Sequence, residues 1–151
     1  MTKSQTIEAI EKARLSHIGQ MEKIDLMLKG VEIENPTSVS KTKCEFGKWL
    51  YGNDENFMAN ILGLQFYEQL DKEHETWHIE YAKIYELLCT KKKKGFFAKV
   101  LNKNSVDTLS LDKAKAYYVE LEATTERLLH MLEKSKRRLM AINETKFLKS
   151  F

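Results

Sequence analysis

The sequence Cys44-Glu45-Phe46-Gly47-Lys48-Trp49-Leu50-Tyr51-Gly52 is the stretch from which the fold of this chain is best inferred. Its large apolar side chains recur every three or four residues, which is typical of a short helix with one apolar face. We therefore predict a short helix over residues 43–50. Cys44 lies in its first turn, where the helix dipole favours the thiolate form of a cysteine. Gly47 allows the backbone of this helix to approach another helix closely.

The composition of the whole chain favours a single helical domain. Its 151 residues include only 1 proline and 6 glycines, which are the residues that most weaken helices. A hydrophobic content of 42% with 31% charged residues is ordinary for a globular protein and excludes a disordered one. We predict one all-α domain over residues 1–151.

Charge and hydropathy narrow the classes of partner and compartment. A net charge of +3 is too small to indicate nucleic-acid binding. No apolar run approaches the roughly 20 residues of a transmembrane helix, and the polar N-terminus lacks the apolar region of a secretory signal. Two cysteines do not make a disulfide framework. We therefore expect a cytoplasmic protein with no transmembrane segment and no nucleic-acid partner.

Apolar residues with helical spacing predict three long helices, over about residues 4–29, 57–90 and 105–147. Gly30 is expected at the left-handed end of the first, and a break or a new start is expected near Gly63 in the second. The predicted fold is an antiparallel four-helix bundle with a short extra helix carrying the cysteine, and its motif-bearing core covers about residues 7–90. A sustained heptad pattern in the last helix favours a homodimer.

Three of the four histidines fall on the inward faces of these helices. His17 lies within the apolar stripe of the first helix, and His74 and His78 are four residues apart on one face of the second. A buried imidazole needs a partner, which is either a backbone carbonyl in an ordinary core or a metal ion. Two histidines one turn apart are a weak signal alone, and Cys44 alone is more often a small buried apolar residue.

The remaining polar candidates are poor metal ligands. His130 falls on the outward side of the last helix, and Cys89 lies three helical turns beyond His78, too far to share one ion. Trp77 and Tyr67 are expected to pack in the core. Four lysines at residues 91–94, followed by two phenylalanines, are interpreted as a solvated helix end rather than a membrane or nucleic-acid contact.

A thiol and three imidazoles are the ligand types that Zn²⁺ prefers, and four of them complete a tetrahedron. The predicted zinc site is His17, Cys44, His74 and His78. Four protein ligands leave no open position for water, so we expect a structural or sensory zinc rather than an enzyme. Zinc would hold Cys44 as a nucleophilic thiolate that an oxidant can attack.

These residues resemble the pattern of the chemoreceptor zinc-binding domain family, which has a first His, then Cys-x-Leu/Phe-Gly-x-Trp, then His-x-x-x-His. Here the pattern reads His17, then Cys44-Glu45-Phe46-Gly47-Lys48-Trp49, then His74-Glu75-Thr76-Trp77-His78. Three residues after His17, where the family often has a large hydrophobic residue, this chain has Gln20.

The resemblance implies a helical bundle, often dimeric, with one zinc ion held by three histidines and one cysteine. It also implies a role in bacterial chemotaxis or cyclic-di-GMP signalling, with a chemoreceptor or diguanylate cyclase as partner. Some similar domains respond to zinc itself or to hypochlorous acid through the cysteine. No receptor or cyclase output domain is recognisable in the chain, so we expect it to act on a partner or to be an excised fragment.

Two alternatives remain open at the level of the sequence. A hemerythrin-like di-iron bundle that binds oxygen has the same architecture, but it needs about five histidines and bridging carboxylates, and the chain has 4 histidines. The other alternative is a metal-free helical adaptor whose histidines are packed in the core.

Overall fold

The computed structural model describes residues 1–52, 57–90 and 107–149. Within these ranges it contains helices and no strands. The elements in chain order are α1 (Lys3–Leu28), α2 (Glu45–Gly52), α3 (Phe57–Leu62), α4 (Leu64–Tyr85), the π-helix η1 (Glu86–Thr90), α6 (Thr108–Ala141) and α7 (Glu144–Leu148). The lysine run at residues 91–94 and the phenylalanines after it fall outside the described residues.

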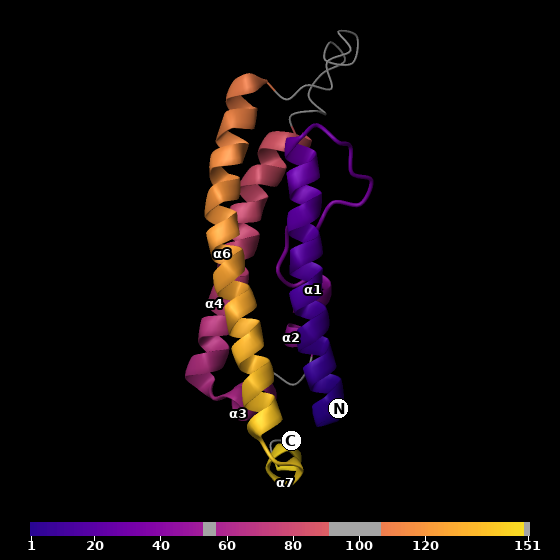
Figure 1. Ribbon diagram of the computed structural model, residues 1–151, viewed down its shortest axis with the longest axis vertical. Helices are drawn as coiled ribbons and strands as arrows, with labels where there is room; N and C mark the ends of the chain where they lie inside the picture. The colour runs from indigo at the N-terminus through magenta and orange to yellow at the C-terminus, as the bar shows by residue number, and fades with distance from the viewer. Residues whose placement is uncertain (53–56, 91–106, 150–151) are drawn as a thin grey trace.

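The long helices α1, α4 and α6 form the body of an all-α bundle, which confirms the predicted fold class. Helix α6 packs along both α1 and α4. Figure 1 shows that α1 and α4 run in the same direction and that α6 runs in the opposite one. The chain therefore needs an arm that returns from the end of α1 to the start of α4.

That returning arm consists of the connection after α1 and the short helix α2 (Figure 1). It is bonded to both long helices that flank it. The Lys23 ammonium on α1 donates to the Asn35 carbonyl at 3.4 Å, and the Tyr81 hydroxyl on α4 donates to the Thr37 carbonyl at 3.1 Å. The up-down-up-down order of a four-helix bundle is thus kept, but one of its arms is helical only in its last two turns.

Several helix ends lie where the sequence predicted them. Thr2 caps α1 with a reciprocal capping box to Gln5, and Gly30 adopts a φ of 84° just after the helix. Gly63, with a φ of 92°, separates α3 from α4 at the predicted break. Asp107 caps α6 by accepting a hydrogen bond from the Ser110 amide.

Both ends of α2 and the end of α6 differ from the prediction. Helix α2 begins at Glu45 and ends at Gly52, each two residues later than expected, and Cys44 takes the capping position before it. The last long helix ends at Ala141 instead of continuing to about residue 147. Asn143 caps the separate helix α7, whose Phe147 is fully buried. The Phe147 ring packs edge-on against Phe57 of α3, at a centroid distance of 6.2 Å.

The core contains the predicted stripe of α6, including Ala114, Leu121, Leu128 and Leu139. Trp77 on α4 is fully buried, and its indole N–H donates to the Thr125 hydroxyl on α6 at 2.8 Å. Its role in packing is therefore confirmed. None of the helices within the described ranges combines the length and the apolar character needed to cross a membrane.

Candidate metal centre

Three histidines meet in the interior between α1 and α4. His17, His74 and His78 are all buried, and each offers one ring nitrogen such that the three nitrogens lie within 4.8 Å of one another. The Nε2 atoms of His74 and His78 are 3.1 Å apart. A single helical turn brings these two residues to one face of α4, while α1 supplies His17 from the neighbouring helix.

Main-chain carbonyls fix the orientation of two of these rings. His17 Nδ1 lies 2.8 Å from the Ala13 carbonyl, and His78 Nδ1 lies 3.1 Å from the Val39 carbonyl. A carbonyl oxygen can only accept, so each Nδ1 carries the proton and each Nε2 keeps its lone pair. The sequence left a carbonyl-bonded core histidine and a metal ligand as alternatives for His17. The structure shows that the carbonyl bond leaves the second nitrogen available.

Side chains orient the third ring. His74 Nδ1 lies 3.2 Å from the Tyr51 hydroxyl on α2, and that hydroxyl donates a short hydrogen bond to the Asp71 carboxylate. Asp71 is also paired with the Lys41 ammonium at 3.1 Å. Because the Tyr51 proton is directed to Asp71, the phenol oxygen presents a lone pair to His74 Nδ1–H. His74 Nε2 therefore faces the other histidines as an acceptor.

Burial keeps the three imidazoles neutral. It lowers the pKa of His17, and it is the largest cause that brings the pKa of His78 to about 4 and that of His74 to about 2. The neighbouring histidines lower both further. A proton is thus disfavoured where two nitrogen lone pairs face each other at 3.1 Å. The two lone pairs repel each other, and a metal ion with affinity for nitrogen would relieve that repulsion. The donor set therefore fits a bound metal ion.

Cys44 stands beside this group, at the start of α2. Its Sγ lies 3.3 Å from His74 Nε2 and accepts a hydrogen bond from the Gly47 amide at 3.2 Å. It lies outside the set of atoms within 4.8 Å of one another. The structure therefore brings three predicted ligands together and places the fourth against one of them.

The structure corrects the expectation that the helix dipole alone favours the thiolate form of Cys44. Partial burial raises the pKa of the thiol, and the opposing hydrogen bonds from the amides of Gly47 and Phe46 do not compensate. The helix terminus does act on the sulfur, as predicted, but desolvation of the charged form outweighs it. A nearby cation is needed to hold this sulfur as thiolate.

Gly47 is required where α2 meets the connection before it. A Cβ at this position would overlap the backbone carbonyl of Lys41. The sequence predicted close approach to another helix, whereas the structure shows close approach to the turn at Lys41 in the connection before α2. This contact sets the position of α2 and hence of the Cys44 sulfur.

The residues rejected as ligands lie away from the cluster. His130 is exposed on α6, and Cys89 is half-buried in η1, beyond the end of α4. Sequence reasoning missed Tyr51 and Asp71. Asp71 is three residues before His74 and so shares its helical face, but the contact with Tyr51 follows only from the packing of α2 on α4.

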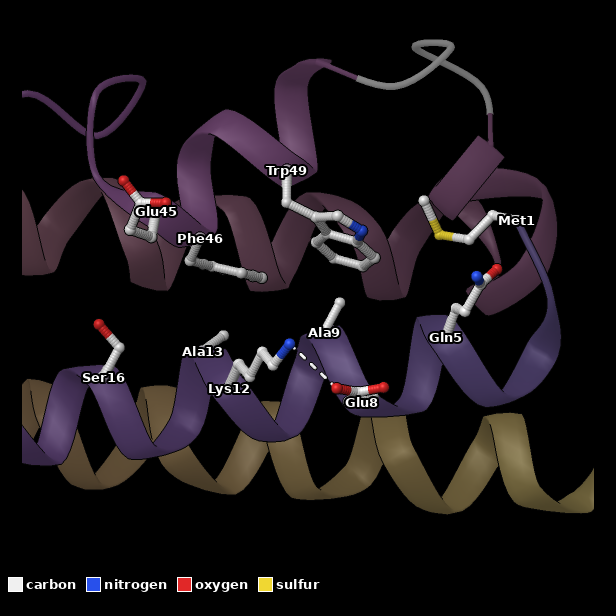
Figure 2. Close-up of a pocket in the computed structure, with 10 residues that line it drawn as sticks. All are labelled: Met1, Gln5, Glu8, Ala9, Lys12, Ala13, Ser16, Glu45, Phe46 and Trp49. Atoms are coloured by element: carbon white, nitrogen blue, oxygen red, sulfur yellow. Dashed lines mark ion pairs between the residues drawn. The ribbon is translucent and has the colours of Figure 1, made fainter.

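A cleft of about 610 Å³ lies between α1 and α2, beside the cluster. Figure 2 shows Phe46 and Trp49 pointing from α2 toward α1, with the Glu8–Lys12 ion pair on the α1 side. The Phe46 ring also contacts the rings of His17 and His74, at centroid distances of 6.0 Å and 4.9 Å. Phe46 is therefore the wall between the cleft and the histidines.

The spacing of the donor atoms suits zinc. With Zn–N bonds of about 2.0–2.1 Å and a Zn–S bond of about 2.3 Å, tetrahedral neighbours are about 3.3 Å apart for two nitrogens and about 3.6 Å for nitrogen and sulfur. The distances between Nε2 of His74 and its two neighbours are 3.1 Å and 3.3 Å. Both distances are close to the tetrahedral values, and Cys44 Sγ would have to move closer to the other histidines to complete the tetrahedron.

Comparison with known proteins agrees with this geometry. No curated protein and no solved structure matches the chain. A family model does match, over residues 17–85, a segment that begins at the first clustered histidine and contains the other two and Cys44. The matching model is that of the chemoreceptor zinc-binding domain, so the predicted resemblance is confirmed over residues 17–85.

Proposed function

We propose that this protein binds one zinc ion through His17, Cys44, His74 and His78, and that Cys44 makes it an oxidant-responsive regulatory domain. The observation that supports zinc binding most strongly is the convergence of three unprotonated Nε2 atoms beside a sulfur. Outer hydrogen bonds to each Nδ1 are the usual companions of metal-ligating histidines.

The proposed site is closed. Three nitrogens and one sulfur fill the tetrahedron of zinc, which leaves no position for a reactive water molecule. Among the described residues, no carboxylate belongs to the histidine group, so the geometry favours a single zinc ion over a di-iron centre with bridging carboxylates. This donor set fits the regulatory character of the matched family better than a catalytic role.

The proposed signal is oxidation of the zinc-bound sulfur. The Cys44 thiolate donates an electron pair to hypochlorous acid and gains its oxygen and proton, and chloride leaves, so that Cys–S⁻ and HOCl give Cys–SOH and Cl⁻. A neutral sulfenic acid is a poorer zinc ligand than a thiolate. Oxidation therefore weakens the bond that would hold the start of α2 to the metal.

The proposed output is a change in the position of α2. This helix is short, and the connection before it has no regular secondary structure, so its position depends on the contacts made by its own side chains and by Cys44. We propose that a chemoreceptor or a diguanylate cyclase in the cytoplasm reads this change in a homodimer of the domain. The apolar heptad positions of α6 are buried in the core of one chain, so the proposed dimer would use other surfaces.

Metal content tests the first part of the proposal. The protein is dialysed extensively against buffer without strong chelators, and its zinc is measured by elemental analysis. We expect about one zinc per chain, falling below that value in Cys44→Ala. Absence of zinc from the wild-type protein after reconstitution would instead support the metal-free adaptor.

The oxidant response tests the second part. Trp49 on α2 provides a fluorescence probe of helix movement, and hypochlorite is added in equimolar amount to the zinc-loaded protein. We expect a fluorescence change that a thiol reductant reverses. Cys89→Ser is the matched control and should retain the response, whereas Cys44→Ser should lose it. A full response in Cys44→Ser would contradict the proposed sensor.

A further inference from the structure

Both nitrogens of His74 contact residues of the segment that contains α2. Nε2 lies 3.3 Å from the Cys44 sulfur, and Nδ1 lies 3.2 Å from the Tyr51 hydroxyl. Cys44 and Tyr51 are seven residues apart, which is about two helical turns, so they lie on one face of α2. The two ends of α2 are therefore attached to a single imidazole ring of α4.

His74 differs from the other two histidines in what orients it. The Nδ1 atoms of His17 and His78 are bonded to main-chain carbonyls, which no substitution at those carbonyl residues removes. The Nδ1 of His74 is bonded to a side chain, and the Tyr51 ring also stacks on the imidazole at an interplanar angle of 23°. The orientation of His74 therefore depends on which side chain stands at position 51.

Asp71 determines which way the Tyr51 hydroxyl points. The carboxylate accepts the phenol proton, and the Lys41 ammonium lies against both groups, 3.1 Å from Asp71 and 5.2 Å from the centre of the Tyr51 ring. The phenol oxygen is consequently left as an acceptor for His74 Nδ1–H. The relay from Asp71 through Tyr51 increases the electron density that His74 Nε2 can donate.

We propose that Tyr51, oriented by Asp71, is the positioning residue for His74 and a second attachment of α2 to α4. This inference rests on the zinc site proposed above. It states that Tyr51 and Asp71, which are not themselves ligands, help to determine the affinity of that site for zinc. Loss of the Cys44 bond alone would then not release α2 from α4, because Tyr51 would remain attached to His74.

Tyr51→Phe tests the proposal, since it keeps the ring and removes the hydroxyl. Zinc affinity is measured by competition with a chromogenic chelator, and the stability of the zinc-free protein is measured by urea unfolding. We expect a loss of zinc affinity of roughly 10- to 100-fold, the usual cost of an outer-shell partner. Tyr118→Phe is the matched control, because its hydroxyl donates to the Met21 carbonyl on α1 and should leave zinc affinity unchanged.

Asp71→Asn provides a second variant that keeps the size of the side chain. Glu75→Gln is its matched control, because Glu75 also pairs with Lys41, at 3.3 Å, but does not accept from Tyr51 in the structure. We expect Asp71→Asn to lower zinc affinity and Glu75→Gln to leave it at the wild-type value. Equal affinities for these two variants would overturn the role of Asp71.

Nitrogen NMR of the zinc-loaded protein separates positioning from a general loss of stability. The His74 Nδ1–H signal should be protected from solvent exchange in the wild type and lose that protection in Tyr51→Phe, while His17 and His78 keep theirs. A wild type that binds zinc, with Tyr51→Phe binding it equally tightly, would overturn this inference and leave the proposed function intact. Failure of the wild type to bind zinc would remove both.

Discussion

The long helices and the short helix α2 position the proposed ligands in different ways. His17, His74 and His78 belong to helices of 26 and 22 residues, whose apolar faces are buried along their length. Cys44 precedes a helix of 8 residues, which is too short to be stable alone. The packing of the bundle therefore positions the histidines, whereas Cys44 depends on the contacts of α2. The comparison shows that the three clustered histidines lie on long packed helices, whereas the proposed fourth ligand lies at the start of a short one.

The largest expected effect comes from removing the ligand that both parts share. His74→Ala should weaken zinc binding by more than about 100-fold, above the cost of losing an outer-shell partner, because Cys44 and Tyr51 lose their common contact. Chelator competition measures the change, and His130→Ala on the exposed side of α6 is the control. Retained tight zinc binding would show that the histidine cluster and the segment containing α2 are not linked through His74.

A smaller effect is expected when α2 is displaced without removing any ligand. In Gly47→Ala the new Cβ would overlap the Lys41 carbonyl, so α2 has to shift. We expect a loss of about 1–3 kcal/mol in the free energy of unfolding, together with weaker zinc binding. Gly52→Ala lies on the same helix in open space and should cost nothing. Equal stabilities of the two variants, measured by urea unfolding, would contradict the close contact.

Acid should act on the histidine part of the site. In the unfolded chain the histidines bind protons below about pH 6.5, whereas burial keeps the folded pKa of His78 at about 4 and that of His74 at about 2. The unfolded state therefore binds more protons in this window, and the stability of the zinc-free protein falls as the pH is lowered from 7 to 4.

Urea unfolding at several pH values measures this dependence. The change in the free energy of unfolding with pH should be the same in His130→Gln, which alters only an exposed histidine. A zinc-free protein equally stable at neutral and acidic pH would mean that the three imidazoles are not held neutral by burial.

The smallest effect on zinc binding is expected in the core behind the histidines. Thr125→Val leaves the buried Trp77 indole N–H without its acceptor and should cost about 1–3 kcal/mol in the free energy of unfolding. Ser135→Ala is the control, because the Ser135 hydroxyl donates only to the Met131 carbonyl of its own helix in the structure. Zinc affinity should stay at the wild-type value in both. A loss of affinity in Thr125→Val would show that Trp77 helps to position the cluster.

Much of the site was predictable because helical periodicity is a local property. The spacing of His74 and His78 determines that they share a face, and the apolar stripe of the first helix determines that His17 points inward. The rejection of His130 followed from the same periodicity and agrees with its exposure on α6.

The sequence by itself determined the helices, the breaks at Gly30 and Gly63, and the three histidines that face the interior. Only the tertiary structure decided that a largely non-helical connection completes the bundle, that α2 lies against α4, and that Tyr51 and Asp71 orient His74. It also decided that burial outweighs the helix terminus at Cys44. The physical reason is that periodicity fixes the face on which a residue lies, whereas desolvation and long-range contacts depend on the elements packed against that face.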